Sequence, residues 1–316
     1  MATPPIVSVV VTTQNRSERL AALLRTLRQQ DLPTARFEVI IVDNASSDGT
    51  AALLERERSR GGLRLTAVRN ETDRGTGAAR NLGWREASAP LIAFTDDDCE
   101  VTPDWLCALV EAAAENPNAV LQGRTEPIER ERSALGPLAR TKHVTSLGPF
   151  FETCNIAYSR DVLERLGGFD ATAFPTWGGE DTDLAWRALA VGSEAVFVDG
   201  ARAFHAVNQL GPIGGLRLAL GWSDAMGVYA RHPGMRRNLH HGVFWRRSHE
   251  LLIAAAAGAI LARRAPLAIV LVLPYVRSLR ARSWGRPLLI PYLALQDALE
   301  VFAAVRGGIR NRTAVI

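Results

Sequence analysis

Short runs of Val, Ile and Leu alternate with helix-forming stretches along the first 125 residues, and this alternation limits the possible folds most strongly. Strands of about four to eight apolar residues, separated by helices of about ten or more, are typical of βαβ units around a mainly parallel sheet. The pattern therefore predicts an α/β fold. Strands are expected at residues 6–12, 37–43, 63–69, 91–95 and 119–123, and helices between them at residues 17–29, 50–60, 75–87 and 103–116.

Polar or glycine-containing segments follow each of the first four predicted strands. Their sequences, in chain order, are TTQN, DNASSDGT, RNETDRGTGAARN and TDDDCE. Because ligands of open α/β sheets bind at the carboxyl ends of the strands, all four segments are expected to meet at one rim. The RGTGAARN segment follows the third strand and lacks the GxGxxG spacing, so it argues against a Rossmann dehydrogenase.

Three adjacent aspartates, Asp96, Asp97 and Asp98, directly follow the fourth predicted strand. Adjacent carboxylates repel each other, and a bound divalent cation removes that conflict. In an extended segment, Asp96 and Asp98 face the same ligand while Asp97 points away. A solvated acidic loop that caps the following helix explains the same residues. The aspartates alone leave both interpretations open.

Two further acidic positions are candidates for function. Asp43 ends the second strand, where its carboxylate is placed to accept a hydrogen bond from a nucleobase or a ribose. Glu180 and Asp181 begin a predicted helix after two glycines in the sequence GGEDTDLAWR. Acidic residues there stabilise the helix dipole, and a carboxylate at that position can also deprotonate a hydroxyl nucleophile.

Charge is distributed unevenly along the chain. Residues 1–200 hold 21 basic and 29 acidic residues, whereas residues 201–316 hold 16 basic and 4 acidic residues. This distribution suits an enzyme that handles a cation-bound anionic ligand in one part and touches an acidic surface, membrane or nucleic acid, with the other. The three cysteines form no CxxC pair, and the N-terminus lacks a basic leader before an apolar run. A reduced, cytosolic catalytic domain is therefore expected.

The pattern changes along the second half of the chain. It weakens from residue 127 to 150, which we interpret as a mobile connection, and strands at CNIAYS and EAVFVD flank two helices. Beyond residue 207 helices take over. Two apolar runs, residues 251–262 and 265–276, are separated by Arg263 and Arg264. Each run is shorter than the roughly 20 residues of a transmembrane helix, so a buried hairpin or an interfacial element is expected. Flanking arginines, with Trp222, Trp245, Trp284 and Tyr275, favour an anionic membrane interface.

The ordered series of motifs resembles an inverting glycosyltransferase of family 2, of the membrane-associated bacterial type. The resemblance spans roughly residues 5–205 and rests on VVVTTQNR, VDNASSDGT, RNETDRGTGAARNLGW, TDDDCEVTPDWL, GGFD and GGEDTDLAWRAL. It implies the GT-A fold, with a mostly parallel central sheet flanked by helices and a C-terminal helical region. Residues 1–206 would form the catalytic domain, and residues 207–316 a helical, basic, membrane-associating region.

The resemblance also implies roles for individual residues. Thr13 and Asp43 match positions that hold the base and ribose of a nucleotide sugar, and Arg80 adds a nucleotide contact. Asp98 would coordinate Mg or Mn on the diphosphate. Asp96 would contact the ribose side of the nucleotide and also coordinate the ion.

Three more positions complete the implied site. Asp181 matches the general base of the family, with Glu180 beside it, and His205 matches a further metal ligand. The family often shows a proline and an aromatic residue where this chain has Thr12 and Gln14. Gln14 cannot stack on a base as an aromatic ring does, so the identity of the donor base stays open, with a UDP-sugar as our first choice.

The resulting hypothesis is a metal-dependent inverting transfer of a sugar to a hydroxyl of a lipid-linked or cell-surface glycan. The protein is expected at the cytoplasmic face of the cell membrane, peripheral or monotopic, with an anionic membrane surface and no nucleic acid as partner. A sugar-nucleotide-forming nucleotidyltransferase is one alternative, although VVVTTQNRSERL lacks the glycine of a phosphate loop. A non-catalytic membrane adaptor is the other.

Overall fold

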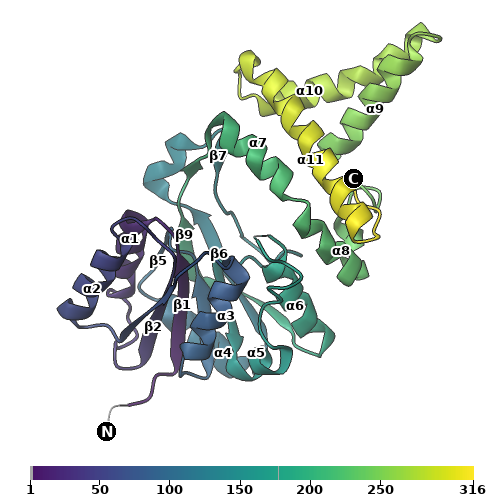
Figure 1. Cartoon of the computed structure of the whole chain (residues 1–316). Coiled ribbons are helices and arrows are strands. Elements are labelled where there is room, and N and C mark those ends of the chain that lie inside the picture. Colours follow the sequence, from purple (N-terminus) through teal and green to yellow (C-terminus); the bar gives the residue numbers. More distant parts are fainter. Residues whose placement is uncertain (1–2, 177) are drawn as a thin grey trace. The chain divides into compact units, whose positions relative to one another are not determined.

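The chain divides into two compact units (Figure 1). A computed structural model describes residues 3–176 and 178–316. Unit 1 comprises Met1–Ser133 and Thr141–Val207, and unit 2 comprises Ala134–Arg140 and Asn208–Ile316. The segment in which the sequence pattern weakens therefore contributes to both units.

An eight-stranded sheet in the order β3-β2-β1-β4-β8-β6-β9-β5 forms the centre of unit 1. Four of its seven pairings are parallel, namely β1–β2, β2–β3, β1–β4 and β6–β9. The pairings β4–β8, β6–β8 and β5–β9 are antiparallel. The expected α/β fold is thus confirmed, and its parallel part consists mainly of the first four strands. The strands are β1 (Val7–Thr13), β2 (Phe37–Asn44), β3 (Leu65–Asn70), β4 (Leu91–Thr95), β5 (Cys99–Val101), β6 (Val120–Pro127), β8 (Asn155–Ser159) and β9 (Ala195–His205).

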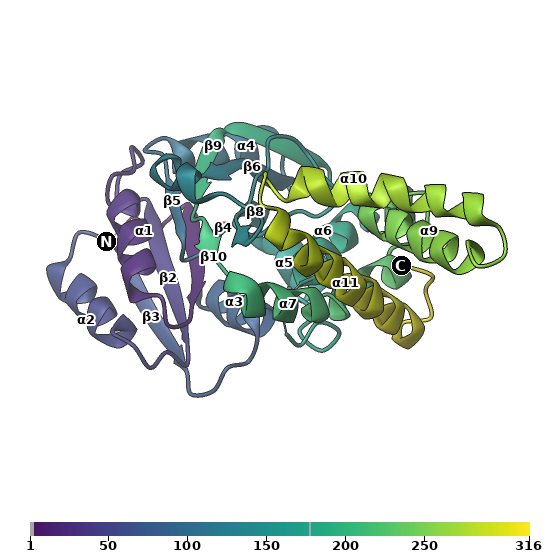
Figure 2. The ribbon, with the colours of Figure 1, turned by 90° about the horizontal axis from the view of Figure 1, so that it is seen from above.

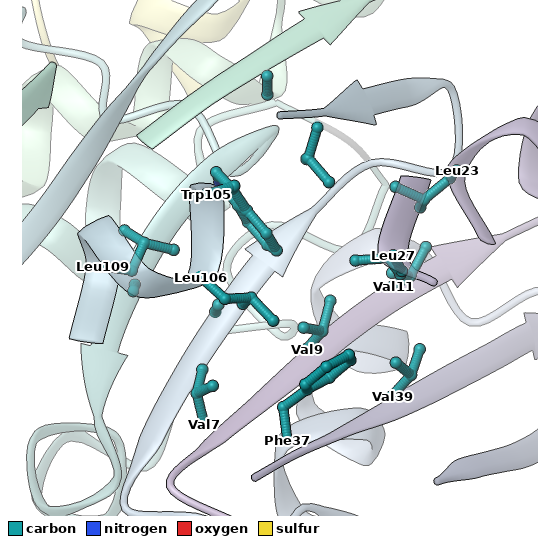
Figure 3. Packing of buried hydrophobic residues seen from close by; sticks show 14 of the residues in the cluster. Val7, Val9, Val11, Leu23, Leu27, Phe37, Val39, Trp105, Leu106 and Leu109 are labelled. Atoms are coloured by element: carbon teal, nitrogen blue, oxygen red, sulfur yellow. The ribbon is translucent and has the colours of Figure 1, made fainter. Parts of the chain in front are cut away.

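Helices pack on both faces of this sheet. Both faces carry apolar side chains, since successive side chains along a strand point to opposite faces. In β1, Val7, Val9 and Val11 join a cluster with helices α1 and α4, in which Trp105 is fully buried (Figure 3). Val10 joins the cluster of α3, α5 and α6 on the opposite face. The helices are α1 (Ser17–Leu27), α2 (Thr50–Arg60), α3 (Thr76–Glu86), α4 (Trp105–Glu115), α5 (Arg160–Leu166) and α6 (Glu180–Ala190), with a short 3₁₀ helix η1 (Glu129–Ala134).

Gly83 allows α3 to approach the sheet closely. A Cβ atom at this position would lie 2.5 Å from a methyl group of Val10 and 3.1 Å from one of Val42. We therefore expect Gly83→Val to lower the free energy of unfolding by about 1–3 kcal/mol, measured by urea denaturation. Gly148→Val is the control, since a Cβ there meets nothing within 4 Å. Equal unfolding midpoints for the two variants would contradict the close packing.

Unit 2 is almost entirely helical, as expected beyond residue 207, apart from the two-stranded pair β7 (Ala139–Arg140) and β10 (Asn208–Gln209). Residues Pro287–Arg310 are long and apolar enough to cross a membrane by length and composition. Tyr275, expected at a membrane interface, is instead buried inside the unit. The helices are α7 (Gly211–Gly221), α8 (Gly227–Arg231), α9 (Arg247–Leu261), α10 (Leu273–Arg282) and α11 (Ile290–Arg310), with 3₁₀ helices η2 (Asp224–Met226), η3 (Pro233–Asn238), η4 (Pro266–Val272) and η5 (Pro287–Leu289).

Candidate active site

The carboxyl ends of β1, β2 and β3 align at one edge of the sheet. Thr13 lies opposite Asp43 in the β1–β2 register, and Asp43 lies opposite Arg69 in the β2–β3 register. Asp43 is buried and accepts hydrogen bonds from the Arg69 guanidinium and from the backbone N–H of Ser46, 2.9 Å away. The salt bridge to Arg69 keeps a buried carboxylate at the strand end.

The acidic loop (residues 96–98) follows β4 as a turn, closed by a hydrogen bond from the Cys99 N–H to the Asp96 carbonyl oxygen. The expectation of an extended segment is therefore wrong, because β4 ends at Thr95 and the chain turns into β5. Asp97 is buried and accepts a hydrogen bond of 2.7 Å from the Thr13 hydroxyl. Thr13, expected to face a nucleotide, thus also anchors the acidic loop.

Asp96 and Asp98 both approach His205, the last residue of β9. Asp98 Oδ1 lies 3.3 Å and Asp96 Oδ2 lies 4.0 Å from His205 Nε2. His205 Nδ1 lies 2.8 Å from the Ala206 carbonyl oxygen, which can only accept, so Nδ1 carries a proton. In the neutral ring, Nε2 therefore presents its lone pair to a carboxylate oxygen. A cation between these two acceptors relieves their repulsion, so the residues fit a metal.

Cys99 is the third member of this group, and its ligand atom lies within 4.8 Å of those of Asp98 and His205. Burial raises the pKa of the Cys99 thiol well above its usual range, so the group stays a protonated thiol. Burial works to raise the pKa of Asp96 as well, but the neighbouring charge of Arg80 lowers it. The donors available to a divalent ion are therefore two carboxylates and one imidazole.

Arg80, expected to contact a nucleotide, connects the acidic loop to helix α6. Its Nη1 donates to Glu180 Oε1 at 2.8 Å, and its Nη2 donates to Asp96 Oδ1 at 3.2 Å. Thr76 also donates to Glu180 Oε1, at 3.0 Å. The other oxygen of Glu180 is buried and has no hydrogen-bond partner among the residues that the structure describes. Arg80 thus holds Asp96 of the acidic loop and Glu180 of helix α6 close to each other.

Asp181 lies at the start of α6, after Gly178 and Gly179, whose φ angles of 92° and 102° favour glycine. One carboxylate oxygen accepts from the Thr182 N–H at 2.8 Å. Burial, followed by the neighbouring carboxyl group of Glu180, raises the pKa of Asp181 to about 7. An aspartate with this pKa is a stronger proton acceptor than an ordinary one and is substantially ionised at neutral pH.

Two basic residues of the site were not among the predicted residues. Arg16 donates to Asp97 Oδ1 at 3.0 Å and to Asp98 Oδ2 at 3.1 Å, and Arg69 holds Asp43. Arg16 lies in the short loop between β1 and α1, so its position near the carboxyl ends of the strands was predictable from the sequence. The sequence pattern predicts Arg69 at the end of the third strand. Its pairing with Asp43 could not be predicted, because the pattern does not give the direction of the side chain.

Comparisons with known proteins agree with this architecture. The model of Glycosyl transferase family 2 matches residues 8–167, just over half of the chain, and a model of the N-terminal domain of galactosyltransferase matches residues 139–209. Glycosyltransferase AglE of Haloferax volcanii is 27% identical over 67% of this chain and 70% of its own length. Validoxylamine A glucosyltransferase of Streptomyces hygroscopicus is 31% identical over 60% of this chain and 52% of its own.

Solved structures share the fold. Mannosyltransferase PcManGT from Pyrobaculum calidifontis, in complex with GDP-Man and Mn²⁺, has a TM-score of 0.62 and 24% identity, covering 96% of this chain and 87% of that one. S. aureus TarS residues 1–349, in complex with UDP-GlcNAc, has a TM-score of 0.53 and 19% identity, covering 97% and 92%. These likenesses show that the chain has the GT-A fold.

More narrowly, the chain belongs to glycosyl transferase family 2, whose model it matches over more than half its length. Family membership decides against both alternatives from the sequence, the nucleotidyltransferase and the non-catalytic adaptor.

Proposed function

We propose that the protein transfers a sugar from a nucleotide-diphosphate donor to an acceptor hydroxyl, in a metal-dependent reaction that inverts the anomeric centre. The observation that carries this proposal is the facing pair of acceptors, Asp98 Oδ1 and His205 Nε2, 3.3 Å apart beside the rim that Thr13 and Asp43 line. Family membership supports the reaction class.

Asp98, His205 and Asp96 would hold the divalent ion. The bound ion would neutralise the leaving diphosphate as a Lewis acid. Mg²⁺ prefers oxygen ligands, whereas Mn²⁺ also accepts imidazole, so the His205 ring favours Mn²⁺. The Ala206 carbonyl orients that ring through Nδ1, which leaves Nε2 directed at the two aspartates.

Thr13 and Asp43 would bind the nucleoside. Asp43 reaches the rim as a carboxylate held by Arg69, and it accepts hydrogen bonds from base or ribose donors. Gln14 donates to the Asn44 carbonyl oxygen at 2.9 Å, so its side chain links β1 to β2. A UDP-sugar is our first candidate, and the donor screen below compares it with GDP- and dTDP-sugars.

Asp181 would act as the general base. An acceptor hydroxyl loses its proton to Asp181 as its oxygen attacks the anomeric carbon from the face opposite the leaving diphosphate. Glu180, held by Arg80 and Thr76, keeps the start of α6 next to the acidic loop and raises the pKa of its neighbour. One in-line displacement of this kind inverts the configuration at the anomeric carbon.

The acceptor is proposed to be a lipid-linked or cell-surface glycan at the cytoplasmic face of the membrane. Residues 1–206 would carry out the transfer, and residues 207–316 would associate with an anionic membrane surface. The excess of 16 basic over 4 acidic residues beyond position 200 supports this division of roles.

A donor screen tests the proposal. Purified protein is incubated with UDP-, GDP- and dTDP-sugars and Mn²⁺ or Mg²⁺, and nucleotide release is measured with and without chelator. We expect release from one nucleotide class, faster with Mn²⁺ than with Mg²⁺ and abolished by chelator. Turnover that persists in chelator contradicts the metal role of Asp98, and no release from any sugar nucleotide contradicts the donor class.

A further inference from the structure

The α9–α10 hairpin of unit 2 exposes large apolar side chains. Leu267 is 85% exposed and Ile260 is 66% exposed. Figure 2 shows α9 and α10 side by side, and the two helices contact each other. We define the apolar hairpin as residues 253–273, which run from within α9 through η4 to the first residue of α10. Its other exposed large apolar residues are Ile253, Leu261, Ile269, Val270, Leu271 and Leu273.

This hairpin is a packed element. Gly258 of α9 is buried, and a Cβ atom there would lie 2.7 Å from both the Ala268 carbonyl oxygen and the Cβ of Leu271, so η4 lies directly against α9. Ala255 and Tyr275 pack together on the inner side. The exposed side chains therefore cover the outside of a formed hairpin, which removes the buried-hairpin alternative.

Charge indicates the chemistry of the partner. The sequence has no acidic residue between Glu250 and Asp297, and six arginines lie in that interval. An apolar surface surrounded by arginines and free of carboxylates matches an anionic phospholipid surface, where each basic residue contributes roughly 1 kcal/mol of attraction. Five of the six arginines are exposed, namely Arg263, Arg264, Arg277, Arg280 and Arg286, whereas Arg282 is paired with Asp297.

We propose that the apolar hairpin lies in the interface of one phospholipid leaflet that contains anionic lipid. This deepens the membrane role proposed above for residues 207–316 and identifies the surface that performs it. On α9, exposed residues recur at Ile253, Ala256, Ala257 and Ile260, which form one helical stripe. Such a stripe buries its apolar face at the boundary between headgroups and acyl chains.

Two arginines decide how the hairpin is oriented. Arg263 and Arg264 are exposed where the chain turns from α9 into η4. End-on insertion would place both guanidinium groups in hydrocarbon, at a cost of several kcal/mol. A hairpin lying flat leaves their side chains free to reach lipid phosphates while neighbouring apolar groups enter the acyl boundary. The leaflet is therefore entered from one side only.

Helix α11 does not cross the membrane in this arrangement, although its length and composition permit it. Asp297 of α11 is buried and accepts hydrogen bonds from Tyr275 at 2.9 Å and from Arg282 at 3.0 Å. Glu300, one turn further, is buried 3.2 Å from the ring of His249. These contacts hold α11 against α9 and α10, and crossing would break them and expose both acids to lipid.

Vesicle sedimentation of the full chain tests the proposal. We compare vesicles of phosphatidylcholine alone with vesicles that also contain phosphatidylglycerol. Wild type is expected to bind the mixed vesicles more tightly than those of phosphatidylcholine alone. High salt is expected to reduce this difference, because it screens the attraction between charges. Leu267→Glu with Val270→Glu is expected to weaken binding by about tenfold or more, because two apolar side chains no longer enter the lipid. Arg263→Ala with Arg264→Ala is expected to reduce the preference for anionic lipid.

Ile213→Glu is the matched control, since Ile213 is a similarly exposed apolar residue on α7. It is expected to bind vesicles like wild type. Unchanged binding of the Leu267 and Val270 double variant overturns the proposal, as does equal loss in the Ile213 control. Loss on Phe302→Glu instead assigns the lipid surface to α11 and overturns it too.

Two further measurements separate other outcomes. A dimer seen by sedimentation velocity without lipid, dissociated by the double variant and unaccompanied by vesicle binding, identifies a second copy as the partner and overturns the proposal. Nucleotide release in solution is expected to be the same for the double variant and wild type. Failure of the sugar-nucleotide proposal removes release from both proteins, so the two failures are distinguishable.

Discussion

Replacement of Asp181 by asparagine is expected to reduce sugar transfer by about 10²- to 10⁴-fold, the usual contribution of a general base. The amide keeps the shape of the side chain and can still accept the hydrogen bond from the Thr182 N–H. It cannot take a proton from the acceptor hydroxyl. Initial rates of transfer measure the effect, and donor affinity should stay near that of wild type because the ion and nucleoside residues are untouched.

The thermal stability of the same variant provides a check that is independent of activity. Burial raises the pKa of Asp181 in the folded protein to about 7, whereas an unfolded aspartate has a pKa of about 3.9. Ionisation of Asp181 therefore costs stability, a cost that is absent below the unfolded pKa and fully present above pH 7. At pH 8, Asp181→Asn should melt at or above the temperature of wild type.

The pH profile of wild type follows from the same pKa. Transfer should fall as the pH drops through about 7, because Asp181 becomes protonated. Burial and Glu180 raise this pKa, while the charges of Lys142 and Arg80 lower it.

Asp161→Asn, at an exposed position in the first turn of α5, is the matched control for Asp181→Asn and should transfer normally. Full transfer by Asp181→Asn, with donor bound, would rule out Asp181 as the base.

The strand-end motifs were predictable because apolar runs mark buried strands, and parallel strands bring their carboxyl ends to one edge. The hydrogen-bond partners of each side chain could not be predicted in this way. Thr13 and Asp97 are 84 residues apart in sequence, and Arg80 and Glu180 are 100 residues apart. No local pattern encodes such contacts, because they depend on how neighbouring loops are positioned by the sheet.

The differences from expectation have local causes as well. The direction of β8, antiparallel to both β4 and β6, depends on its connections, whereas its apolar pattern shows only that it is buried. The turn at the acidic loop arises because β5 begins at Cys99, only a few residues after β4 ends. That turn still brings Asp96 and Asp98 to His205, so the expected grouping holds for a different geometric reason.

Replacement of Asp98 by asparagine is expected to lower metal-dependent transfer by about 10²- to 10³-fold, since a Lewis acid contributes several kcal/mol at the leaving diphosphate. Asp98 Oδ1 is the carboxylate oxygen nearest to His205 Nε2, so the change removes a negative ligand while it keeps the shape. The Mn²⁺ concentration for half-maximal nucleotide release should rise at least tenfold.

Three comparisons test whether this loss comes from the metal. Asp104→Asn, the same change at an exposed position just before α4, should leave the Mn²⁺ requirement as in wild type. His205→Gln should weaken Mn²⁺ binding, measured by paramagnetic resonance of free Mn²⁺, because it removes the nitrogen that faces Asp98. If Asp98→Asn binds Mn²⁺ as tightly as wild type, the ion lies elsewhere.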